Sequence, residues 1–429
     1  MRYSFIFAVS CCFSLPLFSC TTAIISGNAS EDGRPIIFKN ADGSESWSYR
    51  YRIVVSSPAA PGKYAFVGSA MPGWTGSGGI YAGMNEKGLV AVNNTAEDLS
   101  AKNKKLKFDS KAKTLSGNLI VNFLSKCATV DEVEAYLKTV PSFTYGSNYG
   151  FIDAKGGAAY FECGVCGYER FDATDPKVAP NGYLIRSNFA LGSRGDRQVG
   201  GGLARYNRAC EMMKEASSNG AKINIKTLID ISRSLKHGIT GVDLTKNPPS
   251  ANKEQFAYFR DFIPRNTTEV SSIFRGVRPG ESPELTVGWF TPGNPLVSPY
   301  IPVWNRADGK IPLALGNPAG ETLSKQWNQK AKYYIFPINA YIREGLSYIR
   351  HDRLFNAEGT GVIQKLLNWE KEILQKGEKL AATFYASGTI DNSRDQFNQW
   401  VDEYCVKNYR QMIPDTNNLP KENTSSTIP

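Results

Sequence analysis

The feature that most constrains this chain is Cys20, which separates a short apolar leader from a stretch of strand-forming residues. Arg2 gives the leader a positive start, and residues 5–17 form a short apolar run. This pattern is typical of a secretory signal, and the run is shorter than the about 20 apolar residues that a membrane-spanning helix needs. We therefore expect residues 1–19 to be removed, so that the mature chain begins with Cys20 at the start of a strand.

A second interpretation of the leader is open. Leu17-Phe18-Ser19-Cys20 resembles a lipoprotein signal, with a bulky Phe18 where such signals usually carry a smaller residue. This interpretation predicts a lipid-anchored protein in which both the thiol and the amine of Cys20 are acylated. No later stretch is long and apolar enough to span a bilayer. We therefore predict an exported protein, periplasmic or secreted, with a membrane-anchored lipoprotein as the alternative.

Residues 21–28 and 35–40 have the composition of two strands on either side of an Asp-Gly turn. Asp-Gly between two apolar runs is a strong hairpin signal. Folding the chain back at this turn brings Lys39 and Asp42 within a few residues of Cys20. The sequence therefore predicts that a lysine and a carboxylate flank the N-terminus of the mature chain.

The rest of the chain mixes strand and helix patterns. We predict strands at residues 51–57, 64–67, 147–161 and 182–189, a strand that runs from a turn at 85–88 into Asn93 and Asn94, more sheet at 271–302, helices at 117–140, 203–216 and 225–235, and a mostly helical stretch at 356–413 with a break at Gly388. This order favours an α+β layered domain over alternating βαβ units. We expect one domain over residues 20–413, helical in its part 355–413, and a disordered tail at 414–429.

Composition sets the broad class of the protein. The chain has 429 residues, of which 41% are hydrophobic and 12% aromatic, as expected for a packed globular protein. The formal net charge of +10 is a mild excess for this length, and we interpret it as a solvated basic face. No motif for binding DNA or RNA is present, so we predict no nucleic-acid partner.

Histidine and cysteine usage limits the possible chemistry. His237 and His351 are the only histidines, which speaks against a Ser-His-Asp or Cys-His enzyme. Cys163 and Cys166 have zinc-knuckle spacing, but no second pair follows, so we predict no metal site and no other cofactor. A local disulfide between them and two reduced thiols are both open. Three further cysteines lie in helical apolar patterns and are expected in the core: Cys127, Cys210 and Cys405.

A cysteine at the N-terminus is well suited to acyl transfer. The α-amine has an unperturbed pKa of roughly 7.7–8.0 and the thiol one of about 8.5, so both titrate near neutral pH. The amine can accept the thiol proton without a histidine, and the resulting thiolate can attack a carbonyl. The negative oxygen of the tetrahedral intermediate then needs fixed hydrogen-bond donors, which asparagine side chains and backbone N–H groups provide.

Several separated blocks of this sequence occur in the order of a known family. They are Cys20-Thr21, Lys39-Asn40-Ala41-Asp42, Gly83-Met84-Asn85-Glu86-Lys87-Gly88-Leu89 with Asn93-Asn94, Arg186-Ser187-Asn188-Phe189, and Ala204-Arg205-Tyr206-Asn207-Arg208. In these blocks the chain resembles the N-terminal-nucleophile linear amide C–N hydrolases. This group includes choloylglycine (bile salt) hydrolases, penicillin V acylases, and the relatives of acid ceramidase and acylethanolamine amidase. The resemblance implies an α+β fold, a four-layer αββα sandwich.

The resemblance also implies roles for individual residues. Cys20 would be the nucleophile and, through its amine, the base, while Asp42 would hold that amine. Asn188 would bind near the N-terminus and the oxyanion. Asn93 or Asn94 would complete the oxyanion hole, with strand parity favouring Asn93, and Arg205 would bind around the nucleophile, with Arg208 as the fallback. Lys39 stands where bile salt hydrolases carry arginine. It keeps a positive charge that favours thiolate but loses the planar fork, which argues against a bile salt more than against amide hydrolysis.

Taken singly, several of these residues also fit structural roles. Asn40, Asp42 and Asn94 suit turns and caps, and Lys39 and Arg208 suit a charged surface. Taken together, the blocks predict an exported amidohydrolase that cleaves a small linear amide through a thioester, with a homo-oligomer implied by the relatives. A lipid-anchored binding protein and an acyltransferase with the same nucleophile are the alternatives. Bile-acid amides, penicillin V, acyl amino acids and fatty acyl amides all remain open as substrates.

Overall fold

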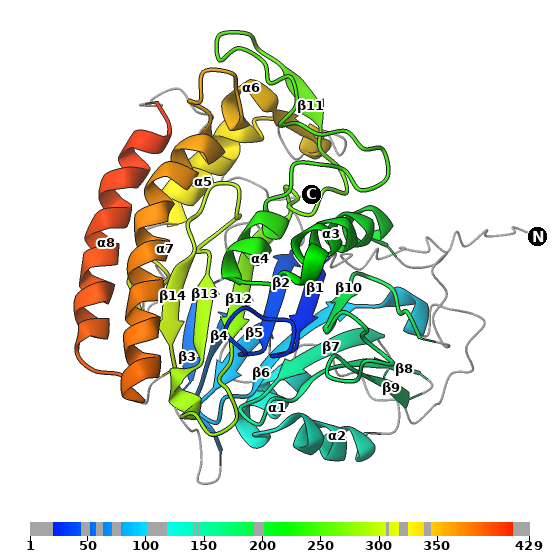
Figure 1. Ribbon diagram of the computed structural model, residues 1–429. Coiled ribbons are helices and arrows are strands. Elements are labelled where there is room, and N and C mark those ends of the chain that lie inside the picture. Colours follow the sequence, from blue (N-terminus) through cyan, green and yellow to red (C-terminus); the bar gives the residue numbers. More distant parts are fainter. Residues whose placement is uncertain are drawn as a thin grey trace, which may run out of the picture.

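The computed structural model describes residues 20–43, 52–56, 63–70, 79–100, 118–140, 143, 146–165, 167–192, 201–305, 309–316, 325–338 and 345–414 (Figure 1). Within these residues, two antiparallel sheets dominate the fold. The six-stranded sheet has the order β10-β1-β2-β12-β13-β14. Its strands are β1 (Thr21–Ile25), β2 (Ile36–Asp42), β10 (Tyr183–Arg186), β12 (Thr268–Arg275), β13 (Val287–Phe290) and β14 (Ile301–Trp304).

The seven-stranded sheet follows the order of the chain from β3 to β9. Its strands are β3 (Arg52–Ser56), β4 (Phe66–Ala70), β5 (Ile80–Asn85), β6 (Val90–Thr95), β7 (Ser147–Ile152), β8 (Ala158–Gly164) and β9 (Gly167–Asp172). A separate two-stranded sheet pairs β11 (Phe256–Tyr258) with β15 (Tyr348–Arg350).

The helices are α1 (Asn118–Lys126), α2 (Val130–Lys138), α3 (Leu203–Ala216), α4 (Ile225–Ser232), α5 (Lys325–Ile335), α6 (His351–Leu354), α7 (Val362–Ser387) and α8 (Ser393–Met412). Figure 1 shows α7 and α8 side by side at the edge of the molecule. Among the helices described, none combines the length and apolarity needed to cross a bilayer. The mixture of antiparallel sheets and helices confirms the predicted α+β class.

Within the described residues, three large groups of buried side chains hold these elements together. The inner faces of the two sheets share one core, in which Ile24 and Ile37 of the six-stranded sheet belong with Val92 of the seven-stranded sheet. On the other face of the six-stranded sheet, residues of β1 and β2 are buried together with residues of α3, α4 and α7. On the other face of the seven-stranded sheet, α1 packs through Phe123, whose ring centroid is 5.1 Å from that of Phe151.

The predicted hairpin is present as β1 and β2. Thr21 pairs with Asn40, and the register continues to the end of β1. Gly33 has a φ of 76°, a left-handed conformation that glycine adopts without strain, and this closes the turn. Every residue of both strands is buried. The hairpin therefore brings the end of β2 next to the beginning of β1, as the sequence predicts.

Two predicted elements are split in the structure. The single helix expected at 117–140 is two helices, because the side chain of Asn85 donates to the carbonyls of Leu124 (2.7 Å) and Cys127 (2.8 Å) at the end of α1. Thr129 then caps α2 by accepting from the Glu132 amide at 3.2 Å. Residue 117 itself lies outside the described residues.

The stretch expected as strand at 147–161 is divided between β7 and β8. Asp153 forms the turn between them by accepting from the amides of Lys155 (2.8 Å) and Gly157 (2.9 Å). The predicted break at Gly388 is confirmed, since this residue has a φ of 73° at the end of α7. The leader at 1–19 and residues 415–429 of the predicted tail lie outside the described residues.

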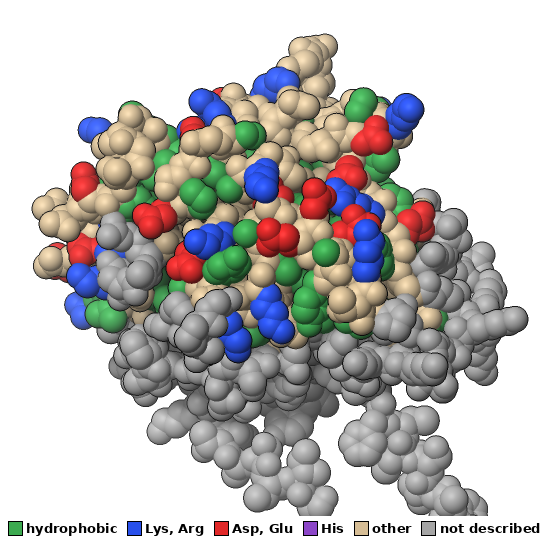
Figure 2. All heavy atoms as spheres, turned by 90° about the horizontal axis from the view of Figure 1, so that it is seen from below, with side chains coloured by type: hydrophobic (Ala, Val, Ile, Leu, Met, Phe, Trp, Pro, Cys, Tyr) green, Lys and Arg blue, Asp and Glu red, His purple; other side chains and the backbone are tan. Residues whose placement is uncertain are grey.

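Charge is distributed evenly on the face shown in Figure 2. Among the coloured residues of this view, basic and acidic side chains lie among one another, without a large area of one sign. This pattern agrees with the interpretation of the net charge of +10 as solvated surface charge.

Candidate functional site

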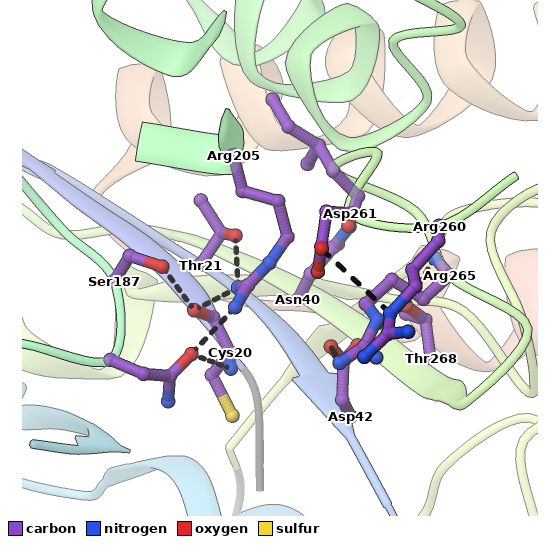
Figure 3. A network of polar contacts seen from close by, with 12 residues as sticks. Cys20, Thr21, Asn40, Asp42, Ser187, Arg205, Arg260, Asp261, Arg265 and Thr268 are labelled. Atoms are coloured by element: carbon purple, nitrogen blue, oxygen red, sulfur yellow. Dashed lines mark hydrogen bonds and ion pairs between the residues drawn. The ribbon is translucent and has the colours of Figure 1, made fainter. Parts of the chain in front are cut away.

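Cys20 lies directly before β1, at the end of the hairpin where β2 also ends (Figure 3). Its exposed fraction is only 4%. The Lys39 ammonium donates to the Cys20 sulfur with an Nζ–Sγ distance of 3.3 Å. The structure therefore brings together the two predicted residues whose contact bears most directly on the reactivity of the thiol.

Lys39 is not a surface charge. It is 1% exposed, and its ammonium also donates to the backbone carbonyl of Asn93 and, at 3.4 Å, to the side-chain oxygen of the same residue. The ring of Tyr81 lies 5.8 Å from Nζ, within the range of a cation–π interaction. The ammonium thus connects β2 with β5 and β6 across the core, and a cation beside the sulfur stabilises a thiolate.

Arg205 and Asn188 hold the backbone of Cys20. Nη1 of Arg205 donates to the Cys20 carbonyl at 2.6 Å, and Nη2 donates to Oδ1 of Asn188 at 2.8 Å. The same Asn188 oxygen accepts from the Cys20 nitrogen at 2.9 Å. Nδ2 of Asn188 donates to the carbonyl of Thr95 at 3.0 Å, which fixes the orientation of the amide. These contacts agree with the positions that the resemblance implies for both residues.

Gly202 makes room for the Arg205 side chain. It lies immediately before α3 with a φ of 86°, and a Cβ atom there would overlap the Arg205 guanidinium and the Ser187 hydroxyl. That hydroxyl donates to the Cys20 carbonyl at 3.3 Å. We did not predict Gly202 from the sequence, although the run of glycines before α3 was a visible signal.

Asn93 and Asn94 point to opposite faces of β6, as neighbours in a strand do. Asn94 is committed to structural hydrogen bonds, because its Nδ2 donates to the Ser187 carbonyl and its Oδ1 accepts from the Thr22 hydroxyl at 3.1 Å. Asn93 instead faces Lys39. The geometry therefore favours Asn93 over Asn94 as a group beside the sulfur.

Asp42 lies at the end of β2 with both oxygens in contact with residues of a distant segment. The Thr268 hydroxyl donates to Oδ1 at 2.6 Å, and Nη1 of Arg265 lies 3.5 Å from Oδ2. Burial raises the pKa of the Asp42 carboxyl, whereas Arg265 and Arg205 oppose that increase. In the full-length chain the Cys20 nitrogen is a backbone amide with a single hydrogen, which is donated to Asn188 and not to Asp42.

Two other predicted candidates lie apart from this group. Arg208 donates to the Ser234 hydroxyl (2.8 Å) and to Glu211 (2.7 Å), so it supports the packing of α3. Asn40 donates to the Ser232 carbonyl at 3.0 Å and links β2 to α4. Both residues therefore make structural contacts, although Arg208 is not the exposed surface charge that one interpretation of the sequence expects.

The other cysteines that the structure describes form no second site. Cys127, Cys163, Cys210 and Cys405 are free thiols, while Cys166 lies outside the described residues. Burial raises the pKa of the Cys127 thiol to about 11, the opposite of what a reactive thiol needs. Among the residues that the structure describes, no group of three His, Cys, Asp or Glu side chains could hold a metal ion.

Comparison with solved structures finds several amide hydrolases. A conjugated bile acid hydrolase from Clostridium perfringens has 13% identity and a TM-score of 0.41, with 68% of this chain and 94% of that chain covered. A penicillin V acylase from Agrobacterium tumefaciens has 17% identity and a TM-score of 0.40, covering 66% and 86%. The N-acylethanolamine-hydrolyzing acid amidase ortholog of Caenorhabditis elegans has 14% identity and a TM-score of 0.40, covering 62% and 93%.

No curated protein sequence matches the chain significantly. The family model described as "Acyl-coenzyme A:6-aminopenicillanic acid acyl-transferase" matches residues 29–237. The matched stretch begins after Cys20 and contains Lys39, Asp42, Asn188 and Arg205. Over residues 29–237 the chain is therefore similar to the acyl-coenzyme A:6-aminopenicillanic acid acyl-transferase family, which is one of the N-terminal-nucleophile hydrolase families.

Proposed function

We propose that this protein is an exported amidohydrolase that cleaves small linear amides with the thiolate of an N-terminal Cys20. The observation that carries the proposal is the contact of the Cys20 sulfur with the buried Lys39 ammonium at 3.3 Å. It is supported by Asn188, which accepts from the nitrogen of the same cysteine at 2.9 Å. The nucleophile and the nitrogen that would serve as its base are thus both held in place on one residue.

The reaction would proceed in two steps. After removal of the leader, the free α-amine of Cys20 takes the thiol proton, and the thiolate attacks the amide carbonyl. The tetrahedral intermediate collapses when the α-ammonium returns this proton to the leaving nitrogen, which departs as a free amine and leaves a thioester. Water, activated by the same amine, then hydrolyses the thioester and releases the carboxylic acid.

The surrounding residues would each have one task. Lys39 stabilises the thiolate, and Asn93, on the same side as Lys39, donates to the oxyanion. Asn188 and Arg205 hold the N-terminal residue through its nitrogen and carbonyl. Asp42 accepts from the α-ammonium that is created when the leader is removed. No step requires a metal or an organic cofactor.

We also propose that the domain spans residues 20–413 and has the four-layer αββα arrangement. This is supported by the two sheets that share a core, with α1 and α2 packed outside one sheet and α3, α4 and α7 outside the other. The relatives imply a homo-oligomer, which light scattering of the mature protein would test.

Substitution of Cys20 tests the proposed function. A panel of amides that contains penicillin V, a glycine-conjugated bile acid, an N-acyl amino acid and a fatty acyl ethanolamide identifies a substrate for the wild-type protein. We expect Cys20→Ala to abolish this activity and Cys20→Ser to lower it by roughly a hundredfold, because a hydroxyl is much harder to ionise. Cys210→Ala, at a partly buried thiol on α3, is the control and should keep full activity. Full activity in Cys20→Ala would refute the proposal.

Acyl transfer is the second candidate, favoured by the description of the family model. Both reactions share the thioester, and they differ only in whether water or an amine attacks it. Product analysis with 6-aminopenicillanic acid or glycine added as acceptor would separate them. New amides formed faster than free acid would assign the protein as an acyltransferase.

A further inference from the structure

We infer that Arg265 and Thr268 are positioning residues that keep the Asp42 carboxylate ionised and fixed next to the N-terminus. The inference rests on the proposed function, in which Asp42 binds the α-ammonium of Cys20. Neither residue belongs to the sequence blocks described above, and both lie beyond residue 237, where the match to the family model ends. Figure 3 shows both side chains beside Asp42.

Thr268 donates its hydroxyl hydrogen to Asp42. It is the first residue of β12 and lies directly opposite Asp42 in the register of β2 with β12. Its Oγ1 accepts from the Arg265 backbone N–H at 2.8 Å and lies 2.6 Å from Oδ1 of Asp42. The hydroxyl hydrogen is donated to Oδ1 of Asp42. A hydrogen bond donated to a carboxylate oxygen favours the ionised form.

Arg265 supplies a charge at the other carboxylate oxygen. Its Nη1 lies 3.5 Å from Oδ2, while the Asp42 side chain is 1% exposed and the Arg265 side chain 22%. A buried carboxylate is thus in contact with a cation that remains partly hydrated. This lowers the cost of ionising Asp42 without requiring a second fully buried charge.

The turn that carries both residues is rigid. Nδ2 of Asn294 donates to the carbonyls of Arg265 (2.7 Å) and Thr268 (2.9 Å), and the Thr268 amide donates to the Arg265 carbonyl at 3.1 Å. The positions of the hydroxyl and the guanidinium are therefore set by the backbone. Carboxylates placed in this way do not need to reorganise when the α-ammonium binds.

The charges around Asp42 come from several elements. Burial raises the pKa of its carboxyl, and the groups that oppose this are, in decreasing order, Arg265 on the turn before β12, Arg205 on α3, the Thr268 hydroxyl and Lys39 on β2. Because the ionised form is the active one, activity should fall as the pH drops through the Asp42 pKa. Removing Arg265 or the Thr268 hydroxyl should raise that pKa, so the acid limb should move to higher pH.

The experiment compares pH profiles of kcat/KM for the mature protein and its variants, with an amide that is cleaved in a Cys20-dependent way. We expect Arg265→Gln and Thr268→Val to move the acid limb upward by about one pH unit, because the first removes an adjacent opposite charge and the second a hydrogen bond to the ionised carboxylate. Arg265→Lys keeps the positive charge, so its acid limb should lie close to that of the wild-type protein. Arg260→Gln is the matched control, since this exposed side chain (62%) pairs only loosely with Asp261, at 4.0 Å.

A second readout does not depend on a substrate. The pH dependence of Cys20 alkylation by iodoacetamide, followed by the mass of the N-terminal peptide, should shift in the same direction in Arg265→Gln and Thr268→Val and not in Arg260→Gln. Unchanged profiles in both variants, with Cys20-dependent activity intact, would overturn the inference and leave the proposed function standing. Full activity in Cys20→Ala would instead refute the proposed function.

Discussion

At the scale of single residues, Lys39 is a fully buried charge that contacts the proposed nucleophile. Its ammonium is buried between the sheets, against the Cys20 sulfur and the Asn93 carbonyl. Burying an ammonium is costly unless hydrogen bonds compensate. The Cys20 sulfur is one of the partners of this ammonium, which agrees with a role of Lys39 in stabilising the thiolate.

Replacing this charge should make Cys20 less reactive. Lys39→Met keeps the length of the side chain and removes the ammonium, so less thiolate should be present at neutral pH. We expect the alkylation rate of Cys20 at pH 7 to fall roughly tenfold, because a cation beside the sulfur favours the reactive thiolate. The rate is measured with iodoacetamide under conditions where unfolding is monitored in parallel. An unchanged rate in a folded variant would contradict the assigned role of Lys39.

Gly202 supports the site without taking part in it. Gly202→Ala should push the Arg205 guanidinium away from Cys20 and strain the backbone, since a left-handed conformation costs a non-glycine residue of order 1–3 kcal/mol. We expect lower kcat/KM together with a lower free energy of unfolding in urea.

The neighbouring Gly201 provides the control for this substitution. An added Cβ at Gly201 meets no atom within 4 Å, so Gly201→Ala should change both quantities little. If the two substitutions had equal effects, the role assigned to Gly202, which is to leave space for the Arg205 side chain, would be wrong.

How much of the site could be predicted from the sequence depends on whether its residues lie in recognisable sequence blocks. Cys20, Lys39, Asn188 and Arg205 lie in sequence blocks with a recognisable pattern, and the structure brings them together. Arg265 and Thr268 were missed, because they reach Asp42 only through the pairing of β2 with β12. The local sequence of a turn does not predict such a long-range contact.

At the scale of elements, a buried ion pair joins helix α7 to the segment that follows α4. Arg233, which follows α4, donates to both oxygens of Glu370 on α7, at 2.6 and 2.8 Å. The Tyr300 amide donates to the same carboxylate at 2.6 Å. All polar atoms of the pair are thus satisfied inside the protein.

Breaking this pair should destabilise the fold. Glu370→Gln leaves the Arg233 guanidinium buried without a counter-charge, and we expect a loss of about 3–5 kcal/mol in the free energy of unfolding. Asp230→Asn is the control, since it removes the exposed pair with Lys226, for which about 0.3–0.5 kcal/mol is expected. Chemical denaturation of the variants measures both. A loss below 1 kcal/mol in Glu370→Gln would mean that α7 is held mainly by apolar contacts.

Local signals explain which elements were predicted correctly. The hairpin has its Asp-Gly turn, and the helix expected at 203–216 has the bounds of α3, because its apolar spacing is regular. The helix at 117–140 and the strand at 147–161 were predicted as single elements. The helix ends where the Asn85 side chain, from another part of the fold, donates to its last turn. The strand ends where the Asp153 side chain accepts from a backbone amide within a turn.

At the scale of the whole molecule, the two sheets are assembled from segments far apart in the chain. β1 lies between β10 and β2, and β2 in turn pairs with β12, more than two hundred residues away in sequence. The α+β class follows from composition and element order, whereas this strand order does not. It is nevertheless this strand order that brings Lys39 of β2 to the Cys20 sulfur and the turn before β12 to Asp42.

The most direct test of the account is the mass of the N-terminal peptide of the protein isolated from the cells that express it, before and after brief incubation with a cleaved amide. We predict a peptide that begins with an unmodified, alkylatable Cys20 and that gains the mass of the acyl group, removable by hydroxylamine, in the presence of substrate. A Cys20 that carries lipid, a cut that leaves it internal, or an acyl group on another residue would contradict the account.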